Sequence, residues 1–429
     1  MTDLRARAIL ALFGLRHAQA QDWPGIDIIC NLLEKRFETF LHDDYAVVWE
    51  ILQRPRPSES WYGWHWCLQV LRGIQELSSC ESLSVEKVYQ QLVRHERKEF
   101  SAQEKNRAFL AIFAILCWTS MTIHPDMQLR QPDNCPLGFL AHGIGPGGLS
   151  QLAISQTARR PITKVFRALK GLLETSGHNE SPEETAGNTT LYAASINLFS
   201  LDTIGRLKIK WVEDLSSHLH FDRQYRILSV FSLPTFCVAS IQRGGKTGAL
   251  QRLSPQGVEK DSSSMHREVL LSYRLIFGQS SGSRSLSSKL ISKLKETSDD
   301  VDPFLDTICS TSIPRSRLVR RFARPRIPGT LFPAANLDLD NSLIQADTYS
   351  SREDFPHFGD RLLAVQRYNL SQQPSRVRDL WRDRRNPLQW YTFWAVLWVG
   401  GIGIMLSVFQ LIAAIMQTYY SAPEPRSTD

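Results

Sequence analysis

Apolar residues recur every three or four positions along residues 1–125, which is the spacing of helices that bury one face. A first helix is expected where Leu4, Ala8, Leu12 and Leu15 form such a stripe. The same stretch has the basic start and small-residue end of a weak secretory signal, but its apolar core spans only about eight residues. An amphipathic helix is therefore the favoured interpretation.

Further stripes predict helices over residues 28–40, 45–52, 61–77 and 85–100. The third of these helices opens with a cluster of four aromatic residues at positions 61–66. Aromatic surface this dense is more typical of a core or a helix-packing anchor than of a ligand cage. Together with the first stripe, these elements predict a helical N-terminal domain.

Residues 108–123 form an apolar run, AFLAIFAILCWTSMTI. A bilayer core requires about 20 apolar residues in a helix, and a shorter run is typical of a buried core helix or a re-entrant segment. We expect a core helix here. A second membrane span is the alternative, and it would reopen the topology of the whole chain.

The chain after residue 125 divides into a mixed segment and a second compact domain. Residues 126–188 are rich in turn formers and include a flexible linker that is low in apolar residues. Residues 189–330 predict a small α+β domain. Its expected elements are a helix over 208–219 and then an alternating hairpin pattern over 218–233, an order that also fits a winged helix.

Later helices are expected over residues 266–278, 286–309 and 354–373, and the last of them leads toward the C-terminal segment. It belongs to a juxtamembrane segment, residues 331–386, that ends in an arginine-rich collar. The predicted fold class is mainly α, with a helical N-terminal domain, a small α+β second domain and a C-terminal transmembrane helix.

The C-terminal part of the chain carries the clearest signal, because no residue from 386 to 423 is charged. Residues 387–419 predict one transmembrane helix, and its apolar centre is long enough to cross a bilayer core about 30 Å thick. A buried core helix is the alternative, but it would have to be apolar on every face. Aromatic residues typical of the two membrane interfaces lie at its ends, namely Trp390, Tyr391, Trp394 and Trp398, and Tyr419 and Tyr420.

The charges flanking this segment differ on its two sides. Upstream, five arginines face only two aspartates, whereas the short tail over residues 420–429 holds a single arginine. The positive-inside rule therefore places the large N-terminal body in the cytosol, with the arginines against an anionic leaflet. The five residues are Arg376, Arg378, Arg382, Arg384 and Arg385.

Composition adds limits on function. The net charge of +7 is modest for 429 residues and owes much to the collar, so nucleic-acid binding is not expected. Seven widely spaced cysteines without a CxxC pair indicate neither a disulfide framework nor a zinc site, and they suit a reducing cytosol. The glycosylation sequons at Asn179, Asn188 and Asn369 would matter only for a lumenal body.

Two glycine-rich stretches resemble nucleotide loops, and neither meets the requirement. Residues 143–148 have GxGxxG spacing, but Pro146 interrupts the loop and no strand pattern precedes it. Residues 245–247 read Gly-Lys-Thr, yet Ser240 occupies the place where a phosphate loop needs its first glycine. We expect ordinary turns and no cofactor.

Candidate catalytic and metal-binding residues are sparse. His218, His220 and Asp222 alternate, so on a strand they would share one face and could hold a divalent metal. No fourth ligand is apparent, and the polar outer face of a hairpin explains the same pattern better. The sequence contains no GxSxG motif, and nothing in it argues for catalysis.

Four segments carry a resemblance: LKIKWVEDLSSHLHFD, LPTFC, EVLLSYRLIFGQ and LWRDRRNPLQWYTFWAVLWVGGIGI. In this order they resemble an uncharacterised family of filamentous-ascomycete fungal proteins, most strongly from Leu207 to Gly403. The resemblance implies a fungal source and a membrane anchor, and no catalytic residues. The tail is also similar to the membrane entry of fungal CorA-like transporters. It lacks their Gly-Met-Asn motif, which speaks against magnesium transport.

The sequence thus predicts a membrane-anchored binding or adaptor protein that faces the cytosol, with the lipid bilayer as its first partner. Gly400, Gly401 and Gly403 could let a second helix approach, so self-association through the anchor is a further expectation. An oligomeric channel or transporter subunit is the main alternative, and an enzyme of unrecognised class is a weaker one. No small-molecule substrate is identified.

Overall fold

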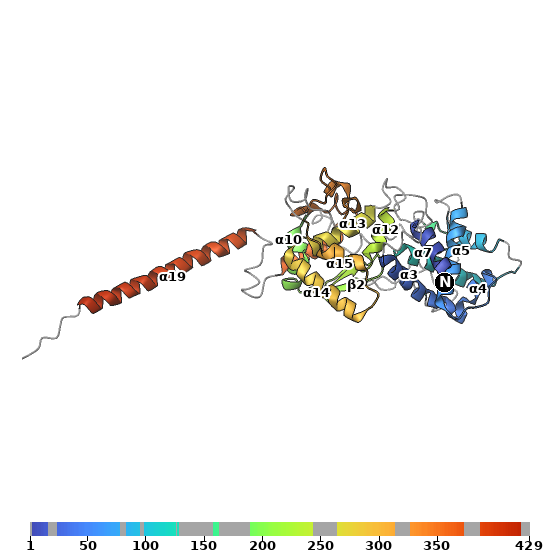
Figure 1. The fold of residues 1–429 in the computed structure, drawn as a ribbon, viewed down its shortest axis with the longest axis horizontal. Coiled ribbons are helices and arrows are strands. Elements are labelled where there is room, and N and C mark those ends of the chain that lie inside the picture. Colours follow the sequence, from blue (N-terminus) through green and yellow to red (C-terminus); the bar gives the residue numbers. More distant parts are fainter. Residues whose placement is uncertain are drawn as a thin grey trace, which may run out of the picture. The chain divides into compact units, whose positions relative to one another are not determined.

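In the computed structural model, the chain forms two compact units, Met1–Ser371 and Gln372–Asp429 (Figure 1). We call the first unit the body. The boundaries predicted at residues 125, 188 and 330 fall inside it and stay predictions. The structure describes residues 2–15, 24–77, 83–94, 98–125, 127, 158–162, 189–242, 264–313, 327–372 and 387–421.

Helices make up the N-terminal part of the body, as the apolar periodicity predicts. They are α1 Thr2–Phe13, α3 Pro24–Phe37, α4 Ala46–Ile51, α5 Gly63–Glu76, α6 Val85–Leu92 and α7 Ala102–Ser120, with short 3-10 turns η1 Glu38–Leu41, η2 Asp43–Tyr45 and η3 Ser60–Tyr62. Helix α1 packs on α5 and buries Ala8 and Leu12, so the amphipathic interpretation is confirmed. Trp64 and Trp66 are completely buried, which confirms the aromatic cluster as a packing anchor.

The apolar run of residues 108–123 lies in the core of the body. Helix α7 starts with a capping box, in which Ser101 and Glu104 bond each other's backbone N–H groups. Every residue from Ala108 to Ser120 is buried. A helix enclosed by protein on all sides is a core helix, so the structure favours the core over a second membrane span.

A three-stranded sheet forms where the sequence predicted a helix and a hairpin. The strands β2 Lys208–Val212, β3 Phe221–Asp222 and β4 Ile227–Phe231 lie in the order β2-β4-β3. The antiparallel β3–β4 hairpin is confirmed. The helix predicted over residues 208–219 is wrong, because its first five residues pair in parallel with β4 and bury Val212.

Among the remaining helices, those over residues 264–310 and 359–371 match predicted helices, whereas the three over residues 193–242 were not predicted. The remaining helices are α10 Ala193–Ile196, α11 Leu198–Thr203, α12 Pro234–Gln242, α13 Ser264–Tyr273, the π-helix η6 Arg274–Gly278, α14 Ser281–Thr297, α15 Pro303–Ser310 and α17 Gly359–Ser371. Short 3-10 turns η7 Gly329–Leu331 and η8 Ala334–Asn336 precede a second sheet, in which β1 Thr190–Tyr192 pairs antiparallel with β5 Thr348–Ser350. The helix predicted over 286–309 breaks between α14 and α15, where Asp302 and Pro303 begin a new helix.

The two halves of the body meet where α3 crosses α12 and α15. Asp302 caps α15 through Phe304 N, and its carboxylate also accepts bonds from the backbone N and the hydroxyl of Thr235 in α12. A Cβ on Gly25 would lie 2.3 Å from Thr235 Oγ1 and 2.9 Å from Asp302 Oδ1. The helices can therefore cross this closely only because residue 25 has no side chain.

A second connection joins α3 and the end of α7 to the segment after β2. Arg36 forms an ion pair with Glu213 at 3.0 Å, and the Arg36 side chain is almost buried. Leu215 N and Ser216 N donate to the backbone carbonyls of Met121 and Thr122 at 2.8 and 2.9 Å. The helical part and the sheet are thus parts of one packed body.

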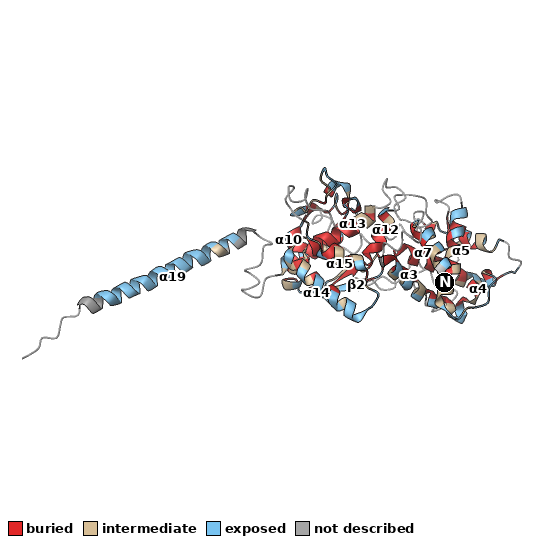
Figure 2. Cartoon of the chain, in the orientation of Figure 1, coloured by how far each residue is buried: buried red, intermediate tan, exposed pale blue. Residues whose placement is uncertain are grey.

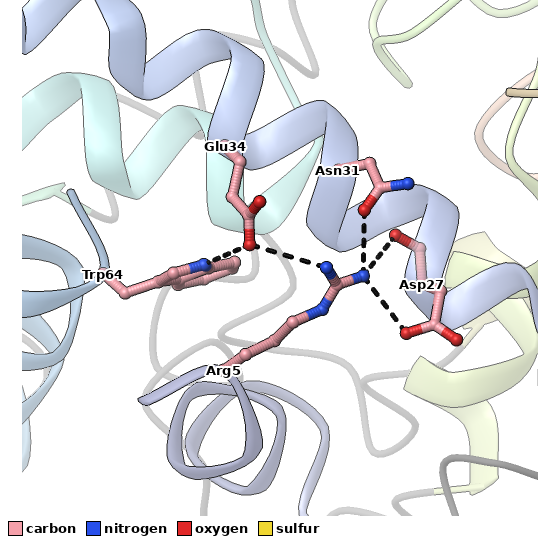
Figure 3. A network of polar contacts seen from close by, with 5 residues as sticks. All are labelled: Arg5, Asp27, Asn31, Glu34 and Trp64. Atoms are coloured by element: carbon pink, nitrogen blue, oxygen red, sulfur yellow. Dashed lines mark hydrogen bonds and ion pairs between the residues drawn. The ribbon is translucent and has the colours of Figure 1, made fainter. Parts of the chain in front are cut away.

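Within the N-terminal helices, a polar network ties α1, α3 and α5 together (Figure 3). Arg5 Nη2 donates to the backbone oxygen and carboxylate of Asp27 and to Asn31 Oδ1, at 2.9, 3.1 and 3.0 Å. Its other terminal nitrogen lies 3.6 Å from the Glu34 carboxylate, which also accepts from Trp64 Nε1 at 2.7 Å. Glu34 is mostly buried, so this network fixes the helices more firmly than an exposed ion pair would.

The crossing at Gly25 yields a stability prediction. Gly25→Ala should lower the free energy of unfolding by about 1–3 kcal/mol, because the methyl group overpacks the contact with Thr235 and Asp302. Gly73→Ala is the matched control, since its Cβ would be no closer than 3.5 Å to Leu92 and alanine favours a helix interior. Urea unfolding followed by circular dichroism measures both, and equal stability of the two variants would contradict the prediction.

Candidate functional site

The C-terminal helix α19, Pro387–Ser421, contains the one candidate membrane span among the described residues. Residues Trp394–Gln417 are long and apolar enough to cross a membrane, at about 36 Å for 24 residues. None of the residues in this stretch is buried (Figure 2). A helix with apolar side chains exposed on every face needs a nonaqueous surrounding, and a bilayer supplies one.

The structure describes the side chains of three of the six predicted interfacial aromatic residues. Tyr391 and Trp398 are exposed on the first turns of α19, and Trp394 is half-buried. Trp390, Tyr419 and Tyr420 lie in the helix, but their side chains are outside the described part. The five collar arginines, Arg376, Arg378, Arg382, Arg384 and Arg385, also lie outside the described residues, so their role stays a prediction.

One stripe of α19 collects several small and polar residues. At helical spacing, Gly400, Gly403, Ser407, Gln410 and Ala414 project from a single face, whereas Gly401 projects from the opposite side. A Cβ added at either glycine of the stripe would meet no atom within 4 Å. The hydroxyl of Ser407 is satisfied by the carbonyl of Gly403 at 2.9 Å, but the Gln410 amide is exposed among apolar neighbours.

Helix α17, the last helix of the body, is held by side-chain amides that the sequence analysis missed. Gln366 accepts from Tyr192 N at 2.6 Å and donates to the carbonyl of Thr190 at 2.9 Å. Asn369 donates to the carbonyl of Ser195 and to the hydroxyl of Ser200, at 2.6 and 2.8 Å. Both amides are buried on the mainly apolar face of α17, which also buries Arg361, and these polar positions within the stripe are the signal that could have revealed them.

The start of α17 is held by a buried carboxylate. Glu268 in α13 accepts from the backbone N of His357 at 3.0 Å, from Phe358 N, and from His357 Nδ1 at 2.8 Å. Burial raises the pKa of Glu268, and these three donors oppose the shift. The backbone N–H groups of His357 and Phe358, just before α17, are therefore satisfied by the Glu268 carboxylate.

His218 is a structural residue, and its predicted place on the outer face of a hairpin is wrong. It is completely buried, and its Nδ1 accepts from Phe231 N at 3.2 Å. The proton must then lie on Nε2, which faces Ser272 Oγ at 2.9 Å, and the hydroxyl donates onward to Val269 O. Because the imidazole donates to the serine, this pair cannot act as a nucleophile with its base.

The alternative considered for these residues, a shared metal-binding face of His218, His220 and Asp222, does not form, since His218 is buried. Burial, together with the nearby guanidinium of Arg361, lowers the pKa of His218 to about 3. Among the described residues, no group of three or more His, Cys, Asp or Glu side chains could hold a metal ion. His218 points into the core, where Arg361 donates to its carbonyl oxygen.

The cysteines within the described ranges are buried and free. They are Cys30, Cys67, Cys117, Cys237 and Cys309. Burial raises the pKa of each thiol, to about 12 for Cys30. A protonated, enclosed thiol is a poor nucleophile, so these cysteines serve packing.

Several sequence motifs fall beyond the described part. They are the glycine stretches at 143–148 and 245–247 and the sequons at Asn179 and Asn188. The third sequon is described, and its Asn369 amide is buried in the hydrogen bonds that hold α17. A glycan on Asn369 is incompatible with this packing.

Comparisons with protein-family models, with curated proteins and with solved structures found no match to this chain. The resemblance to a fungal family therefore stays a prediction.

The buried imidazole gives a pH prediction. The pKa of His218 is about 6.5 in the unfolded chain and about 3 in the folded one, so between these pH values only the unfolded chain takes up the proton. The free energy of unfolding therefore falls as the pH drops below 6.5. The stability difference between the native chain and His218→Gln should shrink by about 1.4 kcal/mol per pH unit below 6.5. Urea unfolding at several pH values tests this, with the exposed His42→Gln as control; a constant difference for His218→Gln would contradict it.

Proposed function

We propose that the chain is a single-pass membrane protein that holds a cytosolic binding or adaptor body at a bilayer. The observation that carries this proposal is that no residue of the apolar stretch Trp394–Gln417 is buried, whereas the body buries its own apolar residues. An exposed apolar surface of this size would drive aggregation in water. In a bilayer the same surface stabilises insertion.

Two features support the cytosolic orientation. The arginine collar precedes α19, and the positive-inside rule places such a run on the cytoplasmic side. Asn369 belongs to a glycosylation sequon, yet its amide is needed for the bonds that hold α17. A cytosolic body avoids the conflict between glycosylation and folding that a lumenal body would meet.

A binding role is favoured over catalysis because the perturbed polar groups of the described body have structural tasks. Asp302 and Glu268 cap helices, and His218 pairs with Ser272 and Phe231. Perturbed pKa values often mark active sites, but structural networks produce them as well. The shifts of Asp302, Glu268 and His218 have structural explanations, so these three groups do not point to a reaction.

The stripe on α19 favours self-association of the anchors. Gly400 and Gly403 let two backbones approach closely, and Gln410 can exchange amide hydrogen bonds with Gln410 of a second copy. An amide in hydrocarbon gains from such a partner because no water is present to bond it. An oligomeric channel or transporter subunit is the second candidate function, because such a protein also requires self-association.

Protease protection on sealed microsomes tests the proposed topology. With an epitope at each terminus of the full chain, we expect protease to remove the N-terminal epitope and to leave a protected C-terminal fragment. Exchange of the five collar arginines for glutamine should reduce the correctly oriented fraction, because each contributes about 1 kcal/mol near an anionic leaflet.

Two results would contradict the topology. Protection of the N-terminal epitope would place the body in the lumen, and the sequons would then become relevant. Complete removal of both epitopes would mean that α19 lies outside the bilayer, and the anchor itself would be refuted.

Energy transfer between donor-labelled and acceptor-labelled chains in liposomes tests self-association. Gln410→Leu should weaken association by about 1 kcal/mol, or roughly fivefold, because the interhelical amide bonds are lost. Gly403→Leu should weaken it further by separating the backbones. Gly401→Leu is the matched control on the opposite side of α19, and an equal effect of all three variants would refute the stripe as the contact face.

A further inference from the structure

Exposed basic residues gather at one end of the three-stranded sheet. The turn from β3 to β4 carries Arg223, Tyr225 and Arg226, all exposed, and the Tyr225 side chain is among the most exposed large apolar groups of the body at 66%. Strand β2 begins beside this turn, since Lys208 N donates to the carbonyl of Arg226 at 2.8 Å. We call Lys208, Arg223, Tyr225 and Arg226 the basic tip.

The shape of the basic tip is fixed by local bonds. The carboxylate of Asp222 accepts from Tyr225 N at 3.0 Å, and Arg226 has a left-handed backbone with φ of 55°. Within the described ranges, the three cations of the tip form no ion pair with a carboxylate. Their charge is therefore available to a partner.

The basic tip lies beside the place where the chain leaves the body. The ring of Tyr368, in the last turns of α17, lies 4.8 Å from that of Phe221 at the start of β3. The hydroxyl of Tyr368 donates to the carbonyl of Gly205, shortly before β2. Helix α17 ends at Ser371, and its last turns expose a further cation, Arg367. The exit of the chain toward the anchor and the basic tip thus share one end of the sheet.

We propose that the basic tip lies on the anionic lipid headgroups of the membrane that holds α19. This inference rests on the proposed membrane anchor. Lysine and arginine side chains are attracted to anionic leaflets, and tyrosine favours the membrane interface. Because the anchor keeps the body close to the bilayer, even a weak attraction suffices to orient it. A lipid surface is the partner that fits best, because it has anionic headgroups for the two arginines and an apolar layer below them for the exposed ring of Tyr225.

The test is hydrogen exchange of the full chain in nanodiscs of phosphatidylcholine alone and of phosphatidylcholine mixed with phosphatidylserine. We expect the amides of residues 221–228 to exchange about fivefold more slowly in the anionic discs, the factor expected for about one cation at an anionic leaflet. High salt should remove the difference, because it screens the attraction.

Variants make the result specific. The triple change Lys208→Glu, Arg223→Glu and Arg226→Glu should abolish the dependence on lipid composition. The control Lys289→Glu with Lys293→Glu changes exposed cations on α14 and should preserve it. Circular dichroism shows whether each variant is folded.

The exchange of α19 separates the two proposals. If α19 is protected in both kinds of disc and residues 221–228 exchange equally in both, the anchor stands and the lipid contact of the tip is overturned. If α19 is unprotected, the anchor is refuted and the lipid contact with it. An unchanged lipid dependence in the triple variant would also overturn the assignment to the basic tip.

Discussion

One buried carboxylate, that of Asp302, holds the helix crossing at which the N-terminal helices join the rest of the body. Asp302 accepts from Thr235 N, from the Thr235 hydroxyl and from Phe304 N, at 2.7, 2.6 and 2.9 Å. Burial raises the pKa of this group, and the three donors offset part of that cost. Because Gly25 leaves room at the same point, α3 reaches α12 and α15, and the N-terminal helices share one core with the sheet. The body is therefore one packed unit.

Most helices of the body could be predicted, because a buried face repeats within each helix itself. Strand β2 could not. Ile209 and Val212 of the strand and Leu215 beyond it are spaced as in a helix, and the strand forms by pairing with β4. Pairing between segments is a tertiary effect, and it overrides the local pattern.

The alternation of His218, His220 and Asp222 was misleading for a related reason. Residues share a face at every second position only while the backbone is extended, and Leu219 has a left-handed backbone with φ of 58°. Similarly, Asn369 bonds Ser195 across 174 residues of sequence, which no local pattern could reveal. Helix α19 was predictable as a candidate membrane span because a bilayer sets conditions on length and apolarity that one segment meets alone.

Besides those that form ion pairs, such as Arg5 and Arg36, the cations of the described body include a buried group and an exposed group. Arg361 and Arg274 are buried and donate to backbone carbonyls, and burial lowers the pKa of each to about 10. Releasing either guanidinium would leave buried carbonyls unsatisfied, so these cations hold the fold and are not available to a partner. Lys208, Arg223 and Arg226 remain in solvent. Only such exposed charges can respond to an outside surface, and these three lie beside the end of α17, which is why we propose them as the contact with a membrane.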